Sequence, residues 1–134
     1  MARFLKDRII AKGQAPGSLI FIGKQKMESS IIHMMRFDSD TLEEEYVEDI
    51  NEAHVKIKEG WVNWINIYGI HDLKMIKDMG KLFQITPLLL EDILNTDQRP
   101  MFDDGEIHDA FILKMLHKEE KSERIMAEQI TLIL

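Results

Sequence analysis

Cysteine is absent from this chain of 134 residues, which excludes disulfides, zinc–thiolate sites and thiol catalysis. Positive charge is also scarce, because 17 Lys and Arg stand against 24 Asp and Glu, giving a formal net charge of −7 at pH 7. Nucleic acids and anionic membranes are bound through clustered Lys and Arg, so this balance argues against both partners. No apolar run approaches the roughly 18 to 20 residues that span a bilayer. We therefore expect a soluble, acidic, cytoplasmic chain that forms a single domain over residues 1–134.

Glycine-rich phosphate loops and nucleophile elbows are missing as well. The seven glycines are scattered, and none of them falls in a G-x-G-x-x-G, P-loop or G-x-S-x-G motif. Nucleotide binding and α/β-hydrolase activity therefore have almost no support. Apolar residues nevertheless make up 45% of the chain and occur in patterned blocks, so we expect a folded domain and not a disordered one.

The blocks alternate between β-forming runs and helical spacing. Strands are predicted by β-branched and aromatic runs at residues 19–22, 31–37, 61–67, 111–116 and 128–134. One helix should begin after Asp72, which can cap its first turn, and a second after Thr86, with Pro87 at its first position. The order of elements predicts an α/β fold, a mixed β-sheet covered by helices.

The remaining segments are predicted to connect these elements. Residues 97–105 should form a loop, and residues 118–124 a charged turn between the last two strands. The acidic tract at 38–49 suits either a strand edge or an amphipathic helix, and periodicity does not separate the two. Residues 1–12 are expected to be flexible. Because the last strand stops on its most apolar stretch at Leu134, we expect the chain to be a piece of a longer protein.

Two weak motifs invite a metal interpretation. The dipeptides His71-Asp72 and His108-Asp109 contain the residue types that hold a divalent metal for phosphoester hydrolysis, but such sites normally draw on a helical bundle. A structural role is therefore favoured, with Asp72 as a helix cap. The acidic tract opens like an EF-hand loop but lacks its glycine and its fifth ligand, so a solvated acidic face is the better interpretation.

The adjacent pair Glu91 and Asp92 is a stronger candidate. Both carboxylates lie in the second predicted helix between apolar neighbours, so at least one of them should lie at the edge of the packed face. Mg²⁺ prefers oxygen ligands, often one or two carboxylates and retained waters. Successive helical residues diverge by about 100°, so the pair needs further ligands from elsewhere. From the residues alone, a solvated helix face remains the favoured interpretation.

Several blocks taken together resemble one known family. The blocks are Pro16–Gly23, Trp64–Asp72, Pro87–Asn95, Gln98–Pro100 and Glu128–Leu134. In this order they resemble the N-terminal cytoplasmic domain of CorA-type magnesium and cobalt transport proteins, with a match that runs from residue 13 to the end. A related zinc transporter with the same architecture remains the alternative, and the His-Asp phosphohydrolase is a less favoured one.

The resemblance implies an α/β/α sandwich in a homopentamer at the cytoplasmic face of the cell membrane. Only a later long helix and two transmembrane helices, absent from this chain, would reach the membrane. The resemblance also implies that Asp92, with Glu91 beside it, helps to bind a regulatory Mg²⁺, or Co²⁺, between adjacent subunits, and that this ion controls the pore. It implies no enzymatic activity and no catalytic residues. With the resemblance, the metal-binding role of the pair becomes the favoured interpretation.

Overall fold

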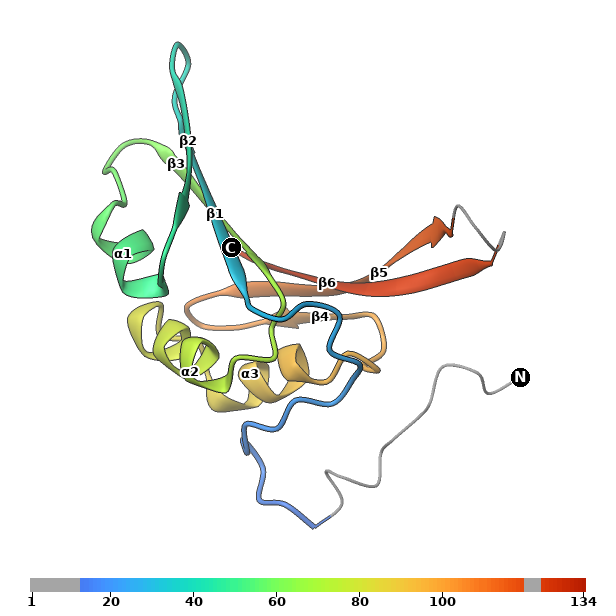
Figure 1. Ribbon diagram of the computed structural model, residues 1–134. Coiled ribbons are helices and arrows are strands. Elements are labelled where there is room, and N and C mark those ends of the chain that lie inside the picture. Colours follow the sequence, from blue (N-terminus) through green and yellow to red (C-terminus); the bar gives the residue numbers. More distant parts are fainter. Residues whose placement is uncertain (1–12, 120–123) are drawn as a thin grey trace. The chain divides into compact units, whose positions relative to one another are not determined.

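The computed structural model describes residues 13–119 and 124–134, and these residues form two compact units (Figure 1). One unit is Lys24–Thr86, and the other combines the segment up to Gly23 with Pro87–Leu134. The expected flexibility of residues 1–12 concerns residues outside the described part. No helix of the described residues is long and apolar enough to cross a membrane.

The unit Lys24–Thr86 contains a three-stranded antiparallel sheet and two helices. Its elements are β1 (Ile31–Phe37), β2 (Leu42–Val47), α1 (Ile50–Val55), β3 (Val62–Tyr68) and α2 (Leu73–Leu82). Strand β1 is central and pairs with both neighbours in the order β2-β1-β3. Its alternation buries Ile32 and Met34 on one face, because successive side chains of a strand point to opposite faces. Helix α1 contacts β1, β2 and α2.

Aspartates cap both helices of this unit. The Asp49 carboxylate accepts a hydrogen bond from the Glu52 amide at 2.9 Å, and the Asp72 carboxylate accepts one from the Met75 amide at 3.0 Å. Each cap satisfies an amide that the helix itself leaves unpaired. The predicted capping role of Asp72 is confirmed.

The acidic tract at 38–49 contributes to a strand and to a helix, since it contains β2 and then Asp49, the residue that caps α1. Most of its acidic residues are exposed, as the solvated-face interpretation expected, and Glu43 and Glu45 are the half-buried exceptions. The Arg36 guanidinium lies 3.0 Å from the Glu43 carboxylate and 2.5 Å from that of Glu45. Lys56 lies 2.5 Å from Glu45, and this hydrogen bond is the main cause that lowers the Glu45 pKa. The strand register places Glu43 and Glu45 opposite Arg36 and Met34, so alternate acidic residues of β2 lie on the face that carries these cations.

The second unit also contains a three-stranded antiparallel sheet. Its elements are α3 (Pro87–Leu94), β4 (Met101–Asp104), β5 (Asp109–Lys118) and β6 (Ile125–Ile133), and the strand order is β4-β5-β6. Helix α3 buries Leu89, Leu90, Ile93 and Leu94, and β5 buries Ala110 and Ile112. Residues 120–123 of the expected hairpin turn lie outside the described residues.

Three expectations about the strands need correction. The described strands form two antiparallel sheets and not one mixed sheet, because each strand pairs with a neighbour that runs the opposite way. The expected loop at 97–105 contains β4, which pairs with the start of β5 through the turn at Gly105. The strand expected at 19–22 is reduced to a single parallel bridge between Ile22 and Asn95, since its partner is the end of a helix, which offers only a few backbone groups.

Candidate functional site

The predicted pair Glu91 and Asp92 lies on α3, and both residues are half-buried. Pro87 begins the helix, as predicted, since its ring fixes a helical φ and its missing N–H is not needed there. Apolar side chains on either side of the pair pack into the second unit and fix the orientation of the helix. The two carboxylates therefore lie at the border of the packed face, as the sequence predicted.

Glu91 is tied to the segment that precedes the helix. Its Oε2 atom accepts a hydrogen bond from the Gly17 amide at 2.6 Å. Gly17 has a φ of +81°, and a Cβ at this position would lie 3.0 Å from the Pro87 Cβ, so glycine suits both the conformation and the close approach. One oxygen of the Glu91 carboxylate is thus already used to hold residues 15–18 against the start of α3.

Asp92 experiences a different environment. Gln98 donates its side-chain amide to Oδ1 of Asp92. Partial burial raises the Asp92 pKa, the nearby charges of Glu91 and Asp103 raise it further, and the hydrogen bond from Gln98 acts in the opposite direction. The ionised carboxylate is therefore short of positive charge in this setting. A bound cation would supply that charge and stabilise the ionised form.

The backbone at the end of α3 is held by two side chains from the sheet. The Gln129 side-chain amide on β6 donates to the carbonyl of Ile93 at 3.1 Å and lies 3.4 Å from that of Asp92. The Lys114 ammonium on β5 donates to the Thr96 carbonyl at 2.6 Å and to Oε1 of Gln129 at 3.2 Å. Burial lowers the Lys114 pKa, and the charge of Asp97 acts in the opposite direction. The Gln129 contacts satisfy carbonyls that the last turn of α3 leaves unpaired, and the Lys114 contact holds the turn that follows the helix.

Gln98, Lys114 and Gln129 were not predicted as parts of this site. Gln98 and Gln129 belong to blocks that carried the family resemblance, and this was the available signal for both of them. Their roles were not visible, because Lys114 and Gln129 reach the end of α3 from strands later in the chain, and no local pattern marks such a contact.

No complete metal site is formed by the part of the chain that the structure describes. Within it, no three His, Asp or Glu side chains lie close enough together to hold an ion. Two carboxylates with retained waters can contribute to a Mg²⁺ site, but the remaining ligands would have to come from outside these residues. The metal role of Glu91 and Asp92 therefore stays a prediction.

The two His-Asp pairs lie in different units, and the aspartate of each pair makes a hydrogen bond that stabilises the fold. His71 and Asp72 belong to Lys24–Thr86, where Asp72 caps α2. His108 and Asp109 belong to the second unit, where the Asp109 backbone exchanges hydrogen bonds with Leu134. Neither unit by itself brings the two pairs together.

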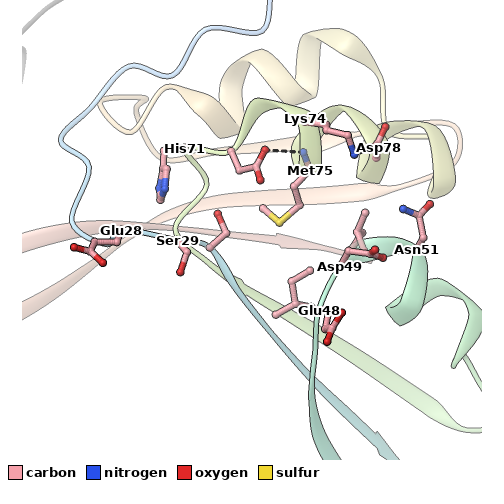
Figure 2. A pocket seen from close by; sticks show the side chains of 13 residues that line it. Glu28, Ser29, Glu48, Asp49, Asn51, His71, Lys74, Met75 and Asp78 are labelled. Atoms are coloured by element: carbon pink, nitrogen blue, oxygen red, sulfur yellow. Dashed lines mark hydrogen bonds and ion pairs between the residues drawn. The ribbon is translucent and has the colours of Figure 1, made fainter.

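A pocket of about 530 Å³ lies between the first turns of α1 and α2 and the start of β1 (Figure 2). Its acidic lining residues are Glu28, Glu48, Asp49, Asp72 and Asp78. Most of these carboxylates already have partners, since Asp49 and Asp72 cap helices and Asp78 pairs with Lys74 at 3.1 Å. Figure 2 shows Asp49 and Asn51 across the pocket from Lys74 and Asp78. The pocket therefore has an acidic lining but no arranged set of metal ligands.

Comparison with known proteins adds one relative. The chain is 34% identical over 123 residues to the cobalt/magnesium transport protein CorA of Thermotoga maritima, a match that covers 92% of this chain and 35% of that protein. The chain thus spans about a third of the length of the curated relative it matches. No protein-family model matches the chain. The similarity confirms the resemblance to a CorA-type fragment that the sequence blocks indicated.

Proposed function

We propose that this chain, whose sequence matches a fragment of a CorA-type transport protein, is the cytoplasmic cation-sensing domain of a magnesium and cobalt transporter. The single observation that carries the proposal is the 34% identity along 92% of the chain. The domain would lie at the cytoplasmic face of the membrane and would have no enzymatic activity. It would reach the membrane only through segments that are not in this chain.

In this proposal, Asp92 and Glu91 bind a regulatory Mg²⁺, with Co²⁺ as a second possible ligand ion. The support is electrostatic, because burial and the neighbouring charges of Glu91 and Asp103 disfavour an ionised Asp92 that has no cation nearby. A dication removes this repulsion, and its charge outweighs the cost of ionising the carboxylate. The net charge of −7 also favours the approach of cations over anions.

The ion would act between subunits of a homopentamer, with its other ligands supplied by a neighbouring subunit and by later parts of the protein. A ligand shifts a conformational equilibrium only through its different affinity for the two states. If Mg²⁺ bridges subunits in the closed state alone, its loss loosens the ring and opens the pore, which couples cytoplasmic Mg²⁺ to transport.

The proposed assembly includes an α/β/α sandwich in which residues 1–134 form one regulatory domain. Its support is the outer face of the β2-β1-β3 sheet, opposite Ile32 and Met34. The exposed apolar side chains on this face are Ile31, Leu42, Tyr46, Val62, Trp64 and Tyr68. Contiguous exposed apolar surface of this kind marks a face that another element covers. In the sandwich, helices from the rest of the protein would cover it.

Two measurements test the proposal. Reading the gene beyond codon 134 should reveal two apolar stretches near the C-terminus, with Gly-Met-Asn at the end of the first, whereas a stop codon at 135 would contradict it. In the protein so encoded, Mg²⁺ should protect this domain from proteolysis. The Asp92→Asn variant should lose that protection, while the matched Asp104→Asn variant, at an exposed position of β4, should keep it. Unchanged protection in Asp92→Asn would refute the metal assignment.

A further inference from the structure

Asp92 is restrained by two glutamine side chains, one at its carboxylate and the other at its backbone. Gln98 donates to the Oδ1 atom. The Gln129 side-chain amide donates to the backbone carbonyl of Asp92 at 3.4 Å and to that of Ile93 at 3.1 Å. The side-chain oxygen and the backbone of one residue are thus restrained by two different amides.

Gln129 is in turn oriented by Lys114. The ammonium donates to Oε1 of Gln129 at 3.2 Å, which leaves the Gln129 amide nitrogen directed toward α3. The same ammonium donates to the Thr96 carbonyl at 2.6 Å, and Thr96 is fixed to Ile22 by its amide at 2.8 Å and its hydroxyl at 3.0 Å. The turn between α3 and Gln98 is therefore anchored to β5 as well.

A carboxylate accepts about four hydrogen bonds or metal bonds, so the single bond from Gln98 leaves lone pairs on Asp92 for an ion. Hydrogen bonds to ligating carboxylates orient them, and loss of such a partner typically costs about 10- to 100-fold in metal affinity. A restrained carboxylate also loses less side-chain entropy when it binds. The arrangement suits a ligand that is held ready before the ion arrives.

We propose that Gln98 and Gln129 are positioning residues for a divalent cation at Asp92, with Gln98 fixing the carboxylate and Gln129, oriented by Lys114, fixing the backbone that carries it. This inference rests on the proposed metal role of Asp92. In this arrangement, side chains from β5 and β6 fix the backbone that carries the proposed metal ligand.

The test uses the 134-residue chain and Mn²⁺, whose paramagnetism broadens nearby amide signals in NMR spectra even at low occupancy. In the unsubstituted chain, the Glu91 and Asp92 signals should broaden with rising Mn²⁺. Gln98→Met keeps the side-chain length but removes the donor, and it should raise the Mn²⁺ concentration for half-broadening about 10-fold. Gln129→Met should act in the same direction. Gln25→Met is the matched control, since Gln25 donates to the Met27 carbonyl in the other unit.

The metal-free chemical shifts of the other amides of α3 provide an internal reference, because a general loss of structure would shift them together with that of Asp92. If the Gln98→Met and Gln129→Met midpoints equal that of the unsubstituted chain while Asp92→Asn abolishes the broadening, the positioning roles are refuted and the metal role stands. If Asp92→Asn leaves the broadening unchanged, the metal role itself is refuted. If one glutamine variant fails to fold, the other decides the outcome.

Discussion

Replacing Gly23 by alanine should destabilise the second unit strongly. A Cβ at this position would lie 2.1 Å from the Thr96 hydroxyl oxygen and 3.1 Å from its Cγ2 atom. Turning the Thr96 side chain away breaks its hydrogen bond to the Ile22 carbonyl. Gly23 also has a φ of +153°, a conformation that side chains rarely adopt. Both effects act at the bridge that joins residues 22–23 to the end of α3.

The magnitude follows from these terms. Backbone strain at such a φ costs about 1 to 3 kcal/mol, and overpacking costs about 1 to 3 kcal/mol. Alanine also lowers the conformational entropy of the unfolded chain, which offsets about 0.4 to 1 kcal/mol of this loss in the free energy of unfolding. We expect Gly23→Ala to lower the free energy of unfolding by about 2 to 4 kcal/mol, a large share of the stability of a small domain.

Urea unfolding followed by far-UV circular dichroism measures this loss, and two further variants separate its causes. Gly60→Ala is the control for strain alone, because Gly60 has a φ of +79° but nothing within 4 Å of an added Cβ. Thr96→Ala removes the clashing atoms, so Gly23→Ala should cost less in its presence. A loss below about 0.5 kcal/mol, or one that Thr96→Ala does not reduce, would refute the steric reasoning.

Three other variants test separate parts of the structure. Ile112→Ala should lower the free energy of unfolding by about 2 to 5 kcal/mol in the same assay, because Ile112 is fully buried, and a loss under about 1 kcal/mol would contradict that burial. Asp72→Ala should cost about 1 kcal/mol while Asp72→Ser retains most of the cap, and equal losses would argue against the capping bond. Asp92→Asn should raise the urea midpoint at neutral pH without metal. Because the Asp92 pKa is raised in the folded state, the contribution of Asp92 to the free energy of unfolding is present at acid pH and is lost as pH rises through that pKa. The urea midpoints of Asp92→Asn and of the unsubstituted chain should therefore converge at acid pH. A lower midpoint for Asp92→Asn at neutral pH would contradict this.

Local signals predicted several elements well. The run of β-forming residues at 31–37 gives β1 with the expected bounds, and the residues at the start of each helix marked where α2 and α3 begin. These features depend on neighbours within a few positions, so the sequence shows them directly. Strand β4 was missed, because Met101–Asp104 is short and is stabilised only by pairing with β5.

Sheet topology could not be predicted in the same way. A strand pattern shows which face is buried but not which strand lies beside it, and the partner decides between one mixed sheet and two antiparallel ones. The run at 19–22 has β-forming residues, yet the backbone of Ile22 bonds to the end of α3. Tertiary pairing therefore overrode a sound local preference.

The candidate site shows the same division between local and distant information. The placement of Glu91 and Asp92 at the border of a packed face follows from helical spacing, and it was expected. The difference between the two carboxylates was not, because it depends on Gly17 for one and on Gln98 for the other. One carboxylate anchors a preceding segment, whereas the other has a raised pKa and a single amide donor. This asymmetry makes Asp92 the better candidate for the proposed metal ligand, and it predicts that Asp92→Asn should reduce cation binding more than Glu91→Gln does.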